Sequence, residues 1–196
     1  MRIFYFLISV TMMLSTAFAE NVKSNTAEKE KSIAAIKSEI KKEKNPTKNF
    51  YLLSQLVRKY ASEKLTAGIV KDAKESADSL LAVSGQFKDD WNYGNAVHHS
   101  NLVLGRLDLL NGKTEDAKKH LKLAAQTPGS PQLKTFGPNM TLAKELLEKS
   151  EKTAVLEYFE DCLEFWKSKF ARQEIDEWKI AIANGKIPEF NGHLVY

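Results

Sequence analysis

The stretch LGRLDLLNGKTEDAKKHLKLA, residues 104–124, holds two apolar helical patterns separated by Asn111-Gly112, a pair typical of a helix C-terminus. Gly105 precedes this pair. Three apolar residues that follow it recur at spacings of four and three and so share one face of a helix: Ala117, Leu121 and Ala124. Because helices approach closely where side chains are small, the stretch predicts a helical hairpin with Gly105 against Ala117.

The same pattern recurs 38 residues later, at Ala143, Val155, Phe159 and Cys162. Internal repetition of this kind is the signature of helical repeat proteins. Leu104-Gly105 with Ala117-x3-Leu121 and Ala124 resembles the tetratricopeptide repeat (TPR), and the second copy resembles it more loosely. Asn101 and Asp108 stand where that repeat usually has Trp and Tyr. Residues 129–143 are also similar to uncharacterised bacterial exported TPR-like proteins, a likeness that implies no activity.

Further helical patterns flank this stretch, and no alternating strand pattern of useful length is present. We expect helices near residues 53–61, 69–81, 91–110, 114–125, 140–149, 153–170 and 173–183, with an irregular Pro/Gly-rich segment at 127–139. The resemblance then implies an all-α fold over residues 49–196. Its architecture would be a short right-handed superhelix of about three TPR-like hairpins plus a C-terminal capping helix.

Residues 1–19 have the pattern of a secretory signal peptide. An apolar run from Ile3 to Leu14 precedes Ala17-Phe18-Ala19, which fits a signal-peptidase site. We therefore expect an exported protein, periplasmic or extracellular and most naturally of a bacterial envelope, without a stable membrane anchor after cleavage. An uncleaved anchor is the alternative. Residues 20–48 read as a charged leader, partly disordered or helical.

The formal charge of +4 is small, and lysines alternate with acidic residues nearly everywhere. This pattern favours a solvated surface over nucleic-acid binding. Cys162 is the only cysteine, so no intrachain disulfide can form. Its position in the repeat predicts a buried, inert thiol, and an intermolecular disulfide is the alternative.

The resemblance implies that a protein or peptide partner binds on the concave face of the superhelix. The residues carried onto that face are His99, Leu102, Arg106 and Lys144. The segment 127–139 supplies three more binding candidates, Gln132, Phe136 and Asn139, unless it serves only as a spacer between hairpins.

No nucleophile elbow, P-loop, HExxH or Rossmann glycine pattern is present, so we expect no enzyme, cofactor or metal site. His98 and His99 are adjacent on a helix and point about 100° apart, which is poor for sharing a metal. The leading hypothesis is a non-catalytic scaffold. The alternatives are a self-associating module, as a homodimer, closed by its own apolar tail (residues 185–196), and a metal-binding or hydrolytic protein using His98 and His99.

Overall fold

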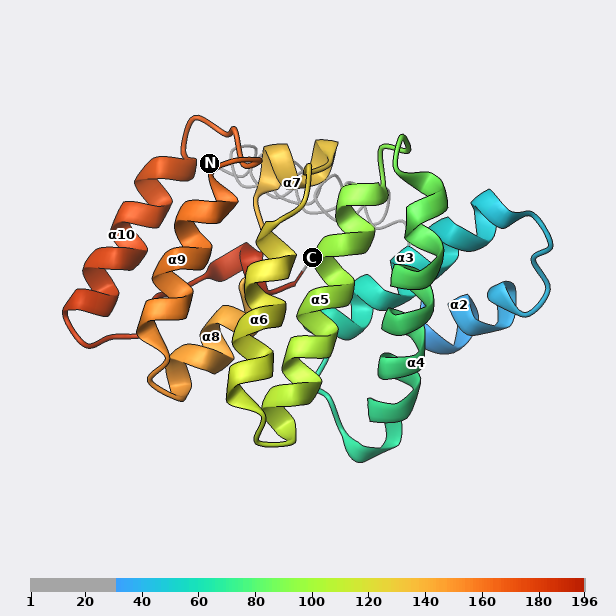
Figure 1. Ribbon diagram of the computed structural model, residues 1–196, viewed down its shortest axis with the longest axis horizontal. Helices are drawn as coiled ribbons and strands as arrows, with labels where there is room; N and C mark the ends of the chain where they lie inside the picture. The colour runs from blue at the N-terminus through green and yellow to red at the C-terminus, as the bar shows by residue number, and fades with distance from the viewer. Residues whose placement is uncertain (1–30, 196) are drawn as a thin grey trace, which may run out of the picture. The chain divides into compact units, whose positions relative to one another are not determined.

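The computed structural model describes residues 31–195, and the predicted signal peptide and the start of the leader lie outside them (Figure 1). The chain divides into two compact units, Met1–Ala35 and Ile36–Tyr196. In the first unit the described residues hold the start of α2 (Ile33–Ile40), the short helix expected in the leader. The described part of the chain is all-helical and contains no strand.

The second unit contains eight further α-helices among its described residues. They are α3 (Pro46–Ser62), α4 (Ala67–Ser84), α5 (Tyr93–Leu110), α6 (Thr114–Ala125), α7 (Pro131–Phe136), α8 (Thr141–Glu148), α9 (Lys152–Cys162) and α10 (Ala171–Ala183). Short 3-10 turns η1 (Gly85–Phe87) and η2 (Asn191–Leu194) complete it. Helices α4, α5, α6, α9 and α10 follow one another side by side, while α3 and α8 both contact α5 (Figure 1).

The hairpin predicted from residues 104–124 is confirmed as α5 and α6. A Cβ added to Gly105 would lie 3.2 Å from the carbonyl oxygen of Ala117 and 3.0 Å from Cβ of His120, and it would overlap Leu142 of α8. The repeated small and apolar positions of both copies are buried, Cys162 among them. The glycine is therefore needed because two helices press on α5 at the same point.

The segment 127–139, which we expected to be irregular, contains the short helix α7. Ser130 caps this helix by accepting a hydrogen bond from the Leu133 amide at 3.0 Å, and Pro131 stands at its first position. Proline has no amide hydrogen, and the first helical position needs none, so a Pro-rich stretch can start a helix. Pro131 therefore starts α7, within the Pro/Gly-rich segment that we expected to be irregular.

Helix α9 ends at Cys162, not near Phe170 as expected. The backbone turns here, and the amide of Trp166 donates to the carbonyl of Cys162 at 2.8 Å. The turn buries Phe165 and stacks Trp166 on Trp178 of α10, with ring centroids 5.9 Å apart. Burial of two large aromatic rings decides the end of the helix, which apolar spacing alone does not reveal.

The C-terminal tail folds back on the last helices. Phe190 is buried against Trp178, at 5.1 Å between ring centroids, and against Phe159 at 6.2 Å. The carbonyl of His193 accepts a hydrogen bond from the Met140 amide at 2.7 Å. None of the described helices combines the length and apolarity that a bilayer-spanning segment requires.

Candidate functional site

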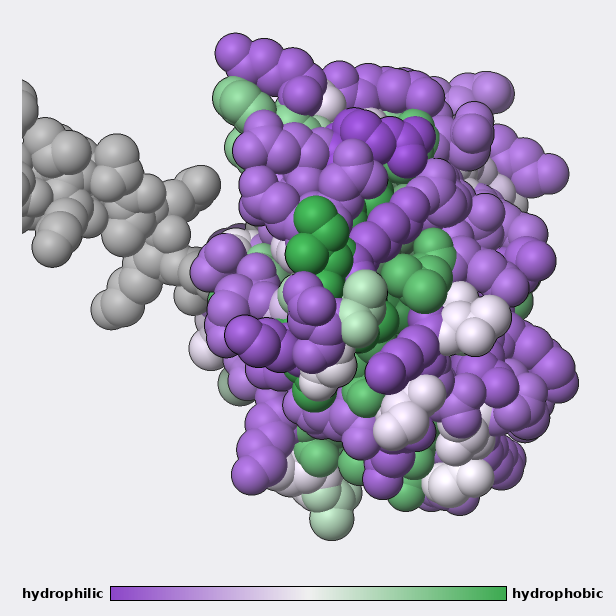
Figure 2. All heavy atoms as spheres, turned by 90° about the vertical axis from the view of Figure 1, so that its left-hand side faces the viewer, coloured by the Kyte–Doolittle hydropathy of each residue, from purple (hydrophilic) through white to green (hydrophobic). Residues whose placement is uncertain are grey.

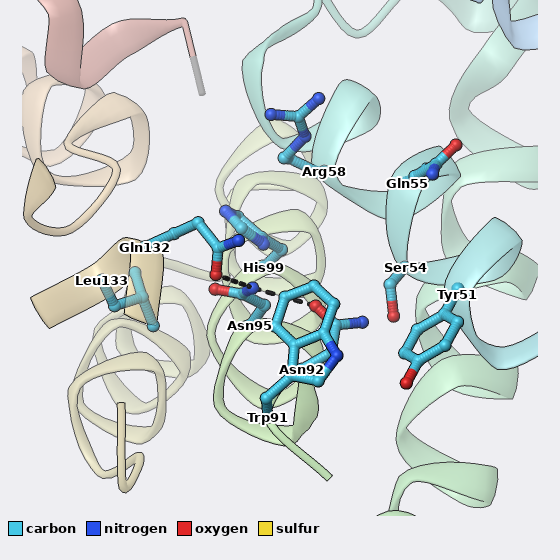
Figure 3. Close-up of a pocket in the computed structure, with 10 residues that line it drawn as sticks. All are labelled: Tyr51, Ser54, Gln55, Arg58, Trp91, Asn92, Asn95, His99, Gln132 and Leu133. Carbon is cyan, nitrogen blue, oxygen red and sulfur yellow. Dashed lines mark hydrogen bonds between the residues drawn. The ribbon is translucent and has the colours of Figure 1, made fainter. Parts of the chain in front are cut away.

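A recess of about 370 Å³ opens between α3, the start of α5 and α7 (Figure 3). Its volume lies in the range of small ligand sites. Three walls that are distant in the sequence form it, since α7 follows α3 by about seventy residues. The short helix α7 belongs to the segment 127–139 between α6 and α8, so the recess depends on that segment.

Helix α3 supplies the first wall through Tyr51, Ser54, Gln55 and Arg58. Their spacing of three, one and three residues places them on one face of the helix. Ser54 is 7% exposed, and its hydroxyl has no hydrogen-bond partner among the described residues. A buried hydroxyl without a partner costs free energy, so this atom is a place where a ligand would gain a contact.

An amide network forms the second wall. The Asn95 side chain donates from Nδ2 to Oδ1 of Asn92 at 2.9 Å and to Oε1 of Gln132 at 3.2 Å. Its own Oδ1 accepts a hydrogen bond from the Ser130 hydroxyl at 2.6 Å. These bonds fix which end of each amide is used internally, so the NH₂ groups of Asn92 and Gln132 are the ends that remain for other partners (Figure 3).

Two aromatic rings form the edge of the recess. Tyr51 and Trp91 stack with centroids 5.7 Å apart, and Trp91 is half-exposed. The phenol of Tyr51 donates to Oδ2 of Asp90 at 2.6 Å, and this bond raises the phenol pKa. The second oxygen of Asp90 accepts a hydrogen bond from the backbone N–H of Asn92 at 2.8 Å. The carboxylate therefore holds the two walls together.

The adjacent histidines are both neutral. Burial lowers the pKa of His98 to about 4, and its ring bonds to the carbonyl of Ala124 at 2.9 Å and the amide of Asn139 at 3.1 Å. Burial, and then the nearby His98 and Arg58, lower the pKa of His99 well below its ordinary value. His99 lines the recess as a neutral ring, whereas His98 packs inside the hairpin.

Arg106 is one of three residues predicted for the concave face that the structure buries, together with His99 and Leu102, and it connects three helices. Its guanidinium donates to both oxygens of Glu145 on α8 at 2.7–3.0 Å. It also donates to three carbonyls at the end of α3, those of Tyr60, Ala61 and Glu63, at 2.9–3.0 Å. Arg106 is 5% exposed and Leu102 is fully buried. The expectation that both residues lie on a partner-binding concave face is thus corrected, because α3 and α8 close over this face of α5.

Of the other predicted residues, Gln132 lines the recess with His99. Lys144 is half-buried on α8, away from the recess. Phe136 is exposed beside a different hollow, formed with the tail. Asn139 is buried, donating to the Ser62 hydroxyl at 3.0 Å and accepting from the Thr141 amide at 2.9 Å, so it joins α3 to α8.

No residue of the α3 wall was predicted from the sequence as part of a site. One signal was available, namely polar residues at 54, 55 and 58 interrupting the buried face formed by positions such as Leu56 and Val57. That pattern does not tell a solvated helix edge from the wall of a recess. The difference depends on where α7 lies.

Two features bear on catalysis and metals. His99 bonds to the backbone of Asn95 and the Ser54 hydroxyl has no partner, so no serine–histidine pair exists in the described recess. The described residues also contain no group of three His, Cys, Asp or Glu side chains arranged to hold a metal ion.

The α9–α10 end of the second unit offers a weaker site. Figure 2 shows this face, where small hydrophobic areas are separated by hydrophilic side chains. A shallow hollow between α9 and α10 is lined by Leu156 and Ile182 and crossed by the Lys179–Glu160 ion pair. The recess between α3, α5 and α7 has the more varied chemistry.

Comparison of the chain with protein-family models, curated proteins and solved structures finds no match.

Proposed function

We propose that this chain is a non-catalytic, TPR-like scaffold of an exported protein, and that it binds a peptide segment of a protein partner. The observation that carries the proposal is the recess between α3, α5 and α7, with its oriented amides, its unpartnered buried hydroxyl and its exposed aromatic edge. Export follows from the signal-peptide pattern of residues 1–19, and periplasm and extracellular space fit it equally.

The paired helices support the repeat assignment. Helices α3 and α4, α5 and α6, and α8 and α9 are three consecutive contacting pairs, with α10 against α9. The small-residue positions in the second and third pairs are buried, as a stacked repeat requires. The period of 38 residues exceeds the period of about 34 residues in the TPR, and α7, which lies between the second and third pairs, accounts for the extra length.

The lining of the recess favours a peptide over a purely apolar ligand. A peptide main chain presents donors and acceptors in alternation, and amide side chains offer both. Asn92, Asn95 and Gln132 provide such groups in a fixed arrangement. The Tyr51–Trp91 edge supplies flat apolar surface for a neighbouring side chain of the peptide.

Self-association is the second candidate, and the packed tail favours it in one respect. Phe190 covers Trp178 and Phe159, so the tail closes the α9–α10 end as that hypothesis expects. The described tail does not line the recess. Sedimentation of the purified protein over a range of concentrations separates a dimer from a monomer that binds a foreign peptide.

Site-specific photo-crosslinking tests the proposed function. A benzoylphenylalanine is placed at Gln55, an exposed position on the recess wall, and at Lys71, an exposed position on α4 that serves as the matched control. We expect an adduct with another envelope protein at position 55 only, and a reduced yield when Trp91→Ala removes the aromatic edge. Equal adducts at both positions, or none at position 55, would refute the recess as the binding surface.

A further inference from the structure

We infer that the peptide segment bound in the recess is rich in proline and adopts the polyproline II conformation. This inference rests on the proposed function and adds the chemical class of the bound segment. Proline rings would lie on the Tyr51–Trp91 edge, and main-chain carbonyls of the segment would accept hydrogen bonds from the amide wall formed by Asn92, Asn95 and Gln132 (Figure 3).

The amide wall presents mainly hydrogen-bond donors to a ligand. The oxygens of Asn92 and Gln132 both accept from Asn95, so their NH₂ groups are the ends that remain for a ligand. The oxygen of Asn95 is also used, because it accepts from the Ser130 hydroxyl. A surface of this kind is complementary to a ligand that carries many acceptors and few donors.

Ser54 on the opposite wall adds a further donor. Its side-chain oxygen is buried, lines the recess and has no hydrogen-bond partner among the described residues. A buried hydroxyl without a partner costs free energy, and an acceptor on the ligand would remove that cost. His99 contributes one acceptor, since one nitrogen of its neutral ring bonds to the backbone of Asn95 and the other does not. The recess thus suits a segment in which an occasional residue keeps its N–H.

A proline-rich segment carries this pattern of groups. Each proline keeps its carbonyl and has no N–H, so a run of prolines presents acceptors without donors. In the polyproline II conformation these carbonyls make no internal hydrogen bonds and remain open to side-chain donors. The conformation also exists before binding, so less conformational entropy is lost when the segment is bound.

The Tyr51–Trp91 edge supplies the apolar part of the match. The two rings stack with centroids 5.7 Å apart, and Trp91 is 50% exposed. The Tyr51 phenol donates to Asp90, and this bond holds the edge against the start of α5. Proline-rich segments are generally recognised on aromatic surfaces of this kind. Aromatic surface and side-chain donors in one recess therefore favour proline over other apolar residues.

Other modes of peptide recognition fit the recess less well. Addition of a strand needs a sheet edge, and the described residues form no strand. An amphipathic helix needs an apolar groove that accepts a cylinder about 10–12 Å across, whereas polar side chains form most of this lining. Recognition of an acidic group needs an available cation. Arg58, the one charged side chain among the described residues of the lining, already interacts within the chain.

Three uncharged hexapeptides that carry the same fluorescent dye test the inference on the full-length protein. Hexaproline has rings and no N–H within the run, hexasarcosine lacks both the N–H and the ring, and hexaalanine has an N–H on every residue. Fluorescence anisotropy measures their affinities. The indole N–H resonance of Trp91, assigned with Trp91→Phe, locates the binding by NMR, since Trp166 and Trp178 are buried.

We expect hexaproline to bind about tenfold or more tightly than hexaalanine and to shift the Trp91 resonance, because it combines several favourable contacts. Hexasarcosine should bind with an intermediate affinity, since it keeps the acceptors and lacks the rings. Trp91→Ala should weaken hexaproline binding by about tenfold. The matched control is Phe170→Ala, which removes a ring of similar exposure beside α10 and should leave binding unchanged.

Gln132→Glu tests the donors without removing the amide network. The variant keeps an oxygen for Asn95 and loses the NH₂ group, so it should weaken hexaproline by about tenfold. Gln173→Glu, at an exposed position on α10, makes the same change of charge and should leave binding unchanged.

Ser54→Ala separates binding from stability. Removing a buried hydroxyl that has no partner should raise the urea midpoint of unfolding and weaken hexaproline binding. Equal affinities of hexaproline and hexaalanine, or no shift of Trp91 by hexaproline, would overturn the inference. The proposed function then stands if the photo-crosslink from position 55 to another protein is still formed, and falls with the inference if that crosslink is absent.

Discussion

Replacing Arg106 by Met should destabilise the protein strongly, although no part of the recess is touched. The guanidinium bonds to both oxygens of Glu145 and to three carbonyls at the C-terminus of α3. The last carbonyls of a helix have no hydrogen-bond partner within the helix, and a cation beside them also interacts favourably with the negative end of the helix dipole. Met fills a similar volume but offers no donor.

The size of the destabilisation depends on how well water can hydrate each group that loses its partner. Removing one partner of a buried ion pair costs about 3–5 kcal/mol, because the other charge is left unpaired. Glu145 is 29% exposed and regains water, so the cost lies near the lower end, about 3 kcal/mol. For a domain of this size the melting temperature should fall by about 6–12 °C.

Urea unfolding followed by circular dichroism measures this change. The matched control is Arg172→Met, because Arg172 also pairs with a glutamate but is 60% exposed, and such pairs contribute about 0–1 kcal/mol. A cycle with Glu145→Met and the double variant isolates the coupling between the two side chains. If Arg106→Met unfolds at the same urea concentration as Arg172→Met, the role assigned to Arg106 in joining α3, α5 and α8 is refuted.

Three further outcomes are expected, each measured by urea unfolding. Gly94→Ala should lower the free energy of unfolding by about 1–3 kcal/mol or more, because the added Cβ would overlap the carbonyl of Gly129. The control Gly85→Ala should be neutral or stabilising by up to about 1 kcal/mol, because Gly85 has helical backbone angles and open space around its Cβ position. Burial holds the pKa of His98 in the folded protein at about 4, below its ordinary 6.5. The contribution of the neutral ring to the free energy of unfolding is therefore complete above pH 6.5, and about 3 kcal/mol is lost as the pH falls to about 4. A His98 ring that titrates near 6.5 in the folded protein by NMR would contradict this. Phe190→Ala should cost about 3–5 kcal/mol, since the ring is buried against α9 and α10, and an unchanged midpoint would show that the tail is not part of the core.

The local pattern of the sequence was enough to predict the all-helical class and the α5–α6 hairpin. Gly105, Ala117 and the Asn111-Gly112 turn lie within one short stretch, and their effect depends only on the helical period and on side-chain size. Burial of Cys162 follows from the same spacing. Predictions of this kind succeed because the interacting residues are near in sequence.

Two predictions were wrong for a different reason, namely the helix expected to continue to Phe170 and the irregular segment expected at 127–139. Both depend on which contacts compete with continued helix or loop, namely the stacking of Trp166 on Trp178 and the capping by Ser130. A helical period continues through positions 163–170 whether or not the backbone does. The competing contact comes from another element and leaves no local mark.

What the sequence determined by itself is therefore the all-helical class, the main hairpin and its buried small residues. The tertiary structure alone decided that α3 and α8 close over Leu102 and Arg106, and that Ser54, Arg58 and Gln132 meet at one recess. The physical reason is that spacing fixes which side chains share a face of one helix, whereas the partner of that face depends on long-range packing. An arginine that caps a neighbouring helix and an arginine that faces solvent have the same local sequence pattern.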